Sequence, residues 1–143
     1  MAFNHSLKTL HLNRADIKDE EGVEIAKVLY NNKTLVKLEL EGNCLGPNTA
    51  RTLAKALAVN KTLQFLDLES NSLTNETEDF QGLLEMLRAL QKNTTLLSLN
   101  LGNNKLEPPI GKEIKKLLEV NKTLIDLEIG FNNFELRDVS SSR

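Results

Sequence analysis

Aromatic residues and cysteine are scarce in this sequence. It has no tryptophan, and aromatic residues make up only 4% of the chain, so any core must be built from aliphatic side chains. The single cysteine, Cys44, cannot form a disulfide within the chain. Chains without internal disulfides are typical of reducing compartments, and we therefore expect a cytoplasmic, intracellular protein.

The sequence also lacks a charge surplus and a long apolar run. Its formal net charge is −2, which argues against a nucleic-acid-binding protein, because such proteins usually carry a basic surplus. No stretch approaches the roughly 20 apolar residues of a membrane-spanning helix, and the first residues lack the pattern of a signal peptide. We therefore expect neither nucleic acid nor a membrane as a partner.

Residues that carry enzymatic chemistry are few. His5 and His11 are the only histidines, and no cysteine–histidine spacing typical of a metal site is present. No phosphate-binding loop and no nucleophile motif occurs. We interpret His11 as a solvated histidine and Cys44 as a half-buried structural thiol. The sequence favours a protein that is not an enzyme and has no cofactor, no metal and no catalytic residues.

The dominant feature that the sequence does contain is an internal repeat. The pattern Leu-x-x-Leu-x-Leu begins at Leu7, Leu35, Leu63 and Leu96, and again at Leu124 with isoleucine in its last place. Successive copies are offset by 28, 28, 33 and 28 residues. The alternation of leucine with other residues predicts a short strand with one buried face in each copy. The strands are expected near residues 9–13, 37–41, 65–69, 98–102 and 126–130.

Helical patterns separate these strands. Apolar residues spaced three and four apart predict helices near residues 19–30, 47–58, 76–91 and 109–120. One unit cannot bury its leucines alone, so the units must stack, with parallel strands on a concave face and helices on a convex face. We expect this domain to cover residues 1–136, followed by a polar tail over 137–143.

The third unit has five extra residues, which lie within 74–81. We expect a longer loop or an extra helical turn there. Such a segment can serve as a binding protrusion, but the simpler interpretation is a tolerated insertion in a surface connection.

Asparagine recurs in register three residues after each strand pattern. The positions are Asn43, Asn71, Asn104 and Asn132, whereas the first unit has Ala15. An asparagine side chain can both donate and accept hydrogen bonds, so it can satisfy backbone groups of its own unit and of the adjacent one. We expect a ladder of structural asparagines that Ala15 interrupts at the first unit.

Asn-x-Ser/Thr sequons also recur, between the end of each helix and the next strand. They stand at Asn4, Asn32, Asn60, Asn93 and Asn121, with one more at Asn75. Asparagine at a helix end can adopt a left-handed cap, and the β-branched threonine suits the start of a strand. We therefore expect these sequons to be structural rather than glycosylated.

The units resemble the helix-containing, ribonuclease-inhibitor-like leucine-rich repeats, because L-x-x-L-x-L-x-x-N-x-L recurs over nearly the whole chain. The resemblance implies an α/β leucine-rich-repeat solenoid, a horseshoe arc, that binds another protein. The sequence of 59–63, Val-Asn-Lys-Thr-Leu, and that of 68–71, Leu-Glu-Ser-Asn, are similar to the C-terminal domain of tropomodulins, which cap actin pointed ends. The longer third unit and the absence of a closing helix depart from that domain.

The resemblance leaves two alternatives to a general interaction scaffold. One is a tropomodulin-like regulator of actin and the cytoskeleton. The other is a GTPase-activating protein of the Ran activator type, for which Arg14, after the first strand, is the nearest counterpart of the functional arginine. Because no helix pattern covers either end, we expect a segment of a larger protein, or ends that a partner caps.

Strand residues that point away from the leucines are expected to line the concave face. They include six acidic residues and one lysine, although the whole chain is nearly neutral. Acidic neighbours on adjacent strands destabilise slightly, and a partner with a basic surface would relieve this repulsion. The alternative is a solvated acidic face, and we expect Phe65 to anchor a contact if the face binds a protein. The candidate protein-binding residues are Lys37, Glu39, Glu41, Phe65, Asp67, Glu69, Asn100, Asp126 and Glu128.

Overall fold

The computed structural model describes residues 6–75 and 78–134, and strands and helices alternate along these ranges. The elements in chain order are β1 (Thr9–His11), α1 (Asp19–Asn31), β2 (Lys37–Glu39), α2 (Pro47–Val59), β3 (Phe65–Asp67), α3 (Gln81–Leu90), β4 (Ser98–Asn100), α4 (Pro108–Val120) and β5 (Asp126–Glu128). The polar tail expected over 137–143 and the sequon at Asn4 lie outside the described residues.

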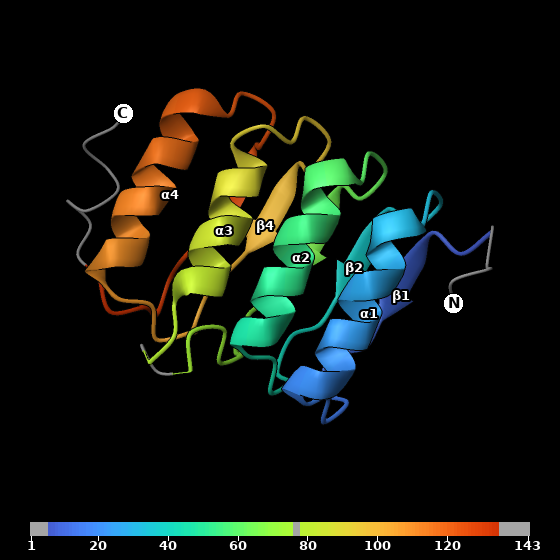
Figure 1. Ribbon diagram of the computed structural model, residues 1–143, viewed down its shortest axis with the longest axis horizontal. Coiled ribbons are helices and arrows are strands. Elements are labelled where there is room, and N and C mark those ends of the chain that lie inside the picture. The colour runs from blue at the N-terminus through green and yellow to red at the C-terminus, as the bar shows by residue number, and fades with distance from the viewer. Residues whose placement is uncertain (1–5, 76–77, 135–143) are drawn as a thin grey trace.

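The strands form one parallel sheet in the order β1-β2-β3-β4-β5, so each strand pairs with its neighbour in the sequence. The four helices lie side by side on one face of this sheet (Figure 1). Parallel strands are spaced about 4.8 Å apart and packed helices about 8–10 Å, so the helical layer must take the outside of an arc. The α/β solenoid expected from the repeat is confirmed.

The core is a stack of leucine rows between the sheet and the helices. Leu38, Leu66 and Leu99 are partners in the strand register, and each is at most 2% exposed. Leu10 and Leu127 occupy the same row in the first and last units and are only partly buried. Within residues 6–75 and 78–134, the first and last units have a neighbouring unit on one side only, which accounts for this difference.

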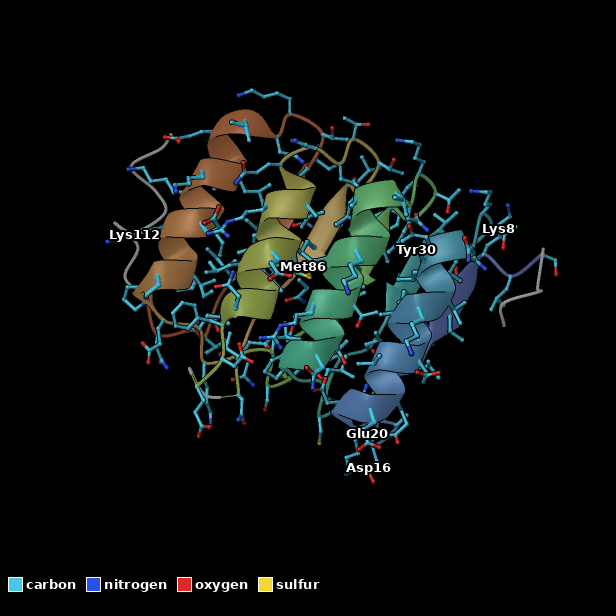
Figure 2. The ribbon with its side chains drawn as sticks, in the orientation of Figure 1. Lys8, Asp16, Glu20, Tyr30, Met86 and Lys112 are labelled. Carbon is cyan, nitrogen blue, oxygen red and sulfur yellow. The ribbon has the colours of Figure 1, made fainter. Side chains whose placement is uncertain are left out.

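Most polar residues of the helices face solvent, although Thr49 of α2 and Glu113 of α4 are buried. Tyr30 and Lys112 lie on the exposed surface of α1 and α4, whereas Met86 of α3 is fully buried (Figure 2). Proline is the first residue of both α2 and α4. Its missing N–H has no partner at that position in any helix, and its fixed φ angle suits the first turn.

The insertion in the third unit forms a loop in its described part. Helix α3 begins at Gln81, five residues after the start of the range 76–91 that the apolar pattern favours. Asn75 adopts a left-handed conformation, and the backbone N–H of Asp79 donates to the carbonyl of Thr74 at 3.0 Å. The Asp79 carboxylate also accepts two hydrogen bonds, at 2.8 and 2.7 Å, from the guanidinium of Arg51. The contacts with Arg51 hold the loop against α2 just before α3 begins.

The N-terminus of α2 is capped by a side chain of the neighbouring unit. Gly46 precedes the helix and has no side chain that could cap it. The carboxylate of Asp19, at the start of α1, accepts hydrogen bonds from the backbone N–H groups of Gly46 and Thr49, each at 2.9 Å. It also accepts from the Thr49 hydroxyl at 2.7 Å. One carboxylate thus joins two consecutive units and satisfies N–H groups that the helix leaves unpaired.

Replacing Asp19 with asparagine is expected to weaken the dependence of stability on acid pH. Burial by itself raises the pKa of the Asp19 carboxyl, but the hydrogen bonds from Thr49, Gly46 and Asn48 outweigh it and lower the pKa below its ordinary value of 3.8. A carboxyl with a depressed folded-state pKa stabilises the protein above the unfolded-state pKa, and that contribution is lost as pH falls through the folded-state value. Urea denaturation from neutral to acid pH should show a steeper fall for wild type. Equal pH dependence would contradict this role.

Candidate binding surface

The face of the sheet opposite the helices is called here the concave face. Because side chains alternate along a strand, the residues on either side of each central leucine point onto this face. The register arranges them in two rows. The lower row is Thr9, Lys37, Phe65, Ser98 and Asp126, and the upper row is His11, Glu39, Asp67, Asn100 and Glu128.

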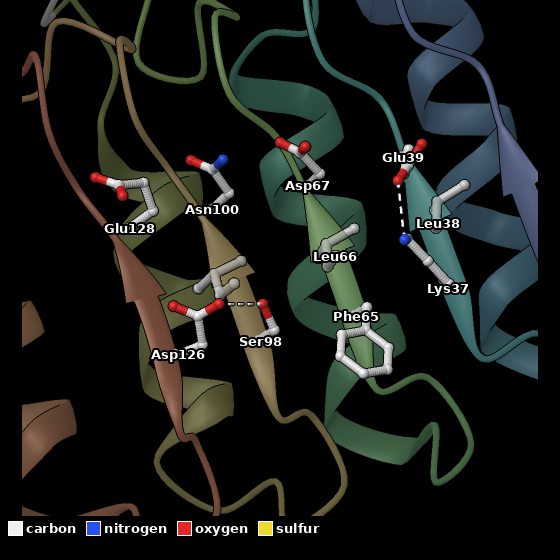
Figure 3. A pocket seen from close by; sticks show the side chains of 11 residues that line it. Lys37, Leu38, Glu39, Phe65, Leu66, Asp67, Ser98, Asn100, Asp126 and Glu128 are labelled. Atoms are coloured by element: carbon white, nitrogen blue, oxygen red, sulfur yellow. Dashed lines mark hydrogen bonds and ion pairs between the residues drawn. The ribbon is translucent and has the colours of Figure 1, made fainter.

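An open concavity of about 300 Å³ lies over β2 to β5. Seven of the nine candidate binding residues line it, namely Lys37, Glu39, Phe65, Asp67, Asn100, Asp126 and Glu128. Glu41 and Glu69 follow their strands and do not line the concavity. Ser98 does line it, although it was not a candidate. The Phe65 side chain lies at the start of β3, with Asp67 further along the same strand and Asp126 two strands away (Figure 3). Phe65 is 38% exposed.

The acids near β1 and β2 have partners of opposite charge within the protein. The carboxylate of Glu39 accepts from the Lys37 ammonium at 3.2 Å and also contacts His11 Nδ1. The His11 hydrogen bond is the largest of the influences that lower the pKa of Glu39. Arg14 and Glu41 form a second ion pair at 3.2 Å. The His11 side chain is 62% exposed, as expected of a solvated histidine, and it also contacts Glu39, its register partner on the adjacent strand, a contact that the sequence analysis did not identify.

The acids of β3 to β5 are arranged differently. Within residues 6–75 and 78–134, no ion pair involves Asp67, Glu69, Asp126 or Glu128. Their hydrogen-bond donors are neutral. Ser98 Oγ donates to Asp126 at 3.3 Å, and the backbone N–H of Gly130 donates to Glu128 at 3.0 Å. The negative charge of this half of the face is thus left for solvent or a ligand.

Asp67 lies in the middle of the upper row, where its surroundings disfavour its negative charge. Burial raises the pKa of its carboxyl, and the nearby carboxylates of Glu69 and Glu39 raise it further. The hydrogen bond from the Glu69 backbone N–H, at 3.0 Å, and the charge of Lys37 act in the opposite direction but do not prevail. A cation placed beside Asp67 would therefore stabilise a charge that the folded protein accommodates poorly.

The residue before each ladder position has a positive φ angle. These residues are Arg14, Gly42, Ser70, Asn103 and Phe131, with φ of 52, 71, 58, 51 and 57°. Glycine and asparagine tolerate this conformation, whereas a bulky side chain there is strained. Phe131 has this strained conformation, and its side chain is 92% exposed. The sequence analysis did not single out these positions, because the residue types at them differ from unit to unit.

The asparagines after the strands join consecutive units. Asn71 Oδ1 accepts from the backbone N–H of Leu45 at 3.0 Å, and its Nδ2 donates to the carbonyls of Leu40 and Leu68, each at 3.0 Å. The same arrangement recurs at Asn43, Asn104 and Asn132. Each side chain pairs with backbone groups of its own unit and of the preceding one, where water has little access.

A second set of asparagines lies at the helix ends. Asn60 has φ of −72° and ψ of 130°, so the left-handed cap expected there is wrong. Its Nδ2 donates to the carbonyl of Leu29 in the preceding unit at 2.8 Å, and its Oδ1 accepts from the backbone N–H groups of Thr62 and Leu63. Asn93 and Asn121 donate to the preceding unit in the same way. The atom to which an N-linked sugar would attach is thus engaged in a hydrogen bond, and Asn60 is only 6% exposed.

Other candidate chemistry on the described residues is limited. Cys44 is exposed, so the expectation of a half-buried thiol is wrong. The side chain of the preceding residue, Asn43, is buried, and that of Cys44 points outward. Among residues 6–75 and 78–134, no three His, Cys, Asp or Glu side chains are grouped so that they could hold a metal ion. In the same part of the chain, no helix has the length and apolar character needed to cross a membrane.

Comparison with known proteins agrees with this geometry. The chain matches the family model described as Leucine Rich repeat over residues 3–26, 31–54, 59–76 and 92–115. The solved structure titled Leiomodin-1 Actin-Binding Site 2 matches with a TM-score of 0.80 and 30% identity, covering 94% of this chain and 75% of that one. The Caenorhabditis elegans tropomodulin C-terminal domain matches with a TM-score of 0.78 and 22% identity, covering 97% and 83%, which shows the shared fold.

No curated protein sequence matches at a significant level. The match to the family model nevertheless extends over more than half of the chain, and the parallel sheet, the outer helices and the asparagine ladder repeat in register with the sequence pattern. The chain therefore belongs to the leucine-rich-repeat family, in its helix-containing, ribonuclease-inhibitor-like form.

Proposed function

We propose that this chain is a non-enzymatic protein-interaction module whose concave face binds a partner with a basic surface. The observation that carries the proposal is the open concavity over β2 to β5, in which Phe65 lies among the carboxylates of both rows. An exposed aromatic ring surrounded by polar groups is typical of a contact that anchors a protein partner. Negative charge around it would attract a basic surface and speed its association.

Reversing charge in the upper row is expected to abolish capture of the partner. In the double variant Asp67→Lys/Glu128→Lys, two carboxylates of the concavity become cations that repel a basic surface. The measurement is affinity capture from cell lysate with wild type and variant, followed by identification of the proteins that only wild type retains.

The matched control is Glu24→Lys/Glu119→Lys. It makes the same change in net charge, but both side chains are exposed on the convex helices α1 and α4. Thermal melts should first establish that both variants fold. Partners lost in the concave variant and kept in the convex control support the proposal. Partners kept by the concave variant would mean that binding takes place elsewhere.

Actin is the second candidate partner. The leiomodin-1 structure, whose title names an actin-binding site, is 30% identical over 94% of this chain. If the chain shares that activity, it should bind monomeric actin in a fluorescence titration or slow elongation at filament pointed ends. An absence of both effects would remove this candidate and leave the general module.

GTPase activation is the weaker alternative. It would depend on Arg14, the guanidinium of which already pairs with Glu41 at 3.2 Å, although the side chain is 78% exposed. If a stimulated GTPase were found, Arg14→Ala should remove the stimulation. An unchanged rate would exclude Arg14 as the functional arginine.

A further inference from the structure

We propose that the β3–β5 half of the concave face binds an arginine-bearing segment of the partner, while the β1–β2 half does not take part in this recognition. This inference rests on the proposed function and deepens it, because it names the part of the face that binds and the side chain that it recognises. Three features support it: the division of charge along the face, the position of Phe65, and the open concavity that Phe65 and the acids line.

The division of charge comes from the ion pairs. On the β1–β2 half, Glu39 is paired with Lys37 and His11, and Glu41 with Arg14, so an incoming cation would have to compete with groups already in place. On the other half, the described residues contain no cation paired with any of the four acids. The acids are Asp67, Glu69, Asp126 and Glu128. A cation gains most where no protein cation is already bound.

The aromatic ring of Phe65 favours arginine over lysine as the recognised side chain. Phe65 pairs with Ser98 in the register, and Ser98 pairs with Asp126, so ring and carboxylate lie in one row on either side of a small side chain (Figure 3). Asp67 lies on the same strand as Phe65 and faces the same concavity. A guanidinium is planar, can stack on an aromatic ring and can pair with carboxylates through several N–H groups at once. A lysine ammonium is a point charge and lacks this double fit.

The carboxylates of this half of the concave face have oxygen atoms available to a guanidinium. Asp126 and Glu128 are exposed, and each accepts one hydrogen bond from a neutral donor, so oxygen lone pairs remain available to a guanidinium. Asp67 is destabilised by burial and by the charges of Glu69 and Glu39, which a guanidinium beside it would relieve. The floor of the concavity is formed by the strand backbone at Leu66 and Leu99, which is already hydrogen-bonded in the sheet. Recognition therefore falls to the ring and the carboxylates.

The test uses labelled peptides in which arginine, lysine or glutamine alternates with serine, with affinity measured by fluorescence anisotropy. Wild type is expected to bind the arginine peptide more tightly than the lysine peptide, and the glutamine peptide least. The variant Asp126→Asn/Glu128→Gln should weaken binding of the arginine peptide about tenfold, as expected for the loss of two exposed ion pairs. The matched control Glu39→Gln/Glu41→Gln makes the same change in net charge on the other half and should change affinity less than about threefold.

A third variant examines the ring. Phe65→Leu keeps an apolar side chain at a partly exposed position, so the protein should fold, but it removes the aromatic surface on which a guanidinium stacks. The preference for the arginine peptide over the lysine peptide should fall towards unity. An unchanged preference would show that Phe65 does not contribute to recognition of arginine and would overturn that part of the proposal.

The remaining outcomes separate this inference from the proposed function. Equal weakening by the two isosteric double variants would overturn the assignment to the β3–β5 half and leave the concave face as the binding surface. Equal affinity of wild type for the arginine and glutamine peptides would overturn the recognition of arginine, and the proposed function would then be judged by the captured partners alone. Thermal melts of every variant ensure that a loss of affinity is not a loss of fold.

Discussion

Replacing Leu68 with alanine is expected to lower the free energy of unfolding by about 2–5 kcal/mol. Leu68 follows β3 in the middle unit, is 0% exposed and belongs to the leucine core. Units stack on both sides of it, and the surrounding leucines are held by the sheet and the helices, so they can collapse only partly into the space that the side chain leaves. The loss therefore combines the transfer of the leucine side chain with the cost of a cavity.

The measurement is equilibrium denaturation by urea, with Leu12→Ala as the matched control. Leu12 occupies the same position in the first unit but is only partly buried, because no described unit stacks on its outer side. The control should lose less than half as much stability as Leu68→Ala. Similar losses at the two positions would mean that burial by stacking does not set the contribution of each leucine.

Replacing Asn71 with alanine is expected to cost at least about 2 kcal/mol of stability, although the side chain is polar. The change leaves the backbone N–H of Leu45 and the carbonyls of Leu40 and Leu68 without the side-chain partner that each now has. Asn71 is 8% exposed, so water cannot easily replace the lost hydrogen bonds. A buried polar group left unpaired costs roughly 1–3 kcal/mol.

Asn132→Ala is the matched control for this substitution. Asn132 makes equivalent hydrogen bonds to Leu106 and Leu101 in the last described unit, but it is less deeply buried, and water can reach the groups that it leaves. Chemical denaturation should show a smaller loss than for Asn71→Ala. If Asn71→Ala costs under about 0.5 kcal/mol, the ladder contributes little to stability and its recurrence needs another explanation.

The repeat in the sequence predicted much of the fold because its signal is periodic. Five copies of the leucine pattern in one register predicted that Leu38, Leu66 and Leu99 point into a common core, and their burial agrees with this. The outward position of Phe65 and Asp67 follows from the same alternation. A wrong prediction for one copy of the repeat is corrected by comparison with the other copies, because stacked units place equivalent residues in equivalent positions.

Features that are not periodic were predicted less well. Helix α3 begins later than its apolar pattern favours, after a loop that Asp79 joins to Arg51 of another unit, a contact that no local pattern reveals. Asn60 was expected to take a left-handed cap, but its hydrogen bond to the preceding unit favours an extended conformation. His11 is solvated as expected, but its contact with Glu39 on the adjacent strand was not predicted. In each case the deciding partner comes from a different unit.

The amino-acid sequence by itself determined the phase of the strands, the side of each strand that is buried and the family of the chain, because these depend on which residue types recur at fixed spacing. Only the tertiary structure decided how charge is divided over the concave face. Whether a carboxylate has a partner depends partly on what stands beside it in the adjacent unit, as His11 of β1 stands beside Glu39 of β2. Coulomb energy depends on distance in space, and residues 28 positions apart in the sequence become neighbours when the units stack.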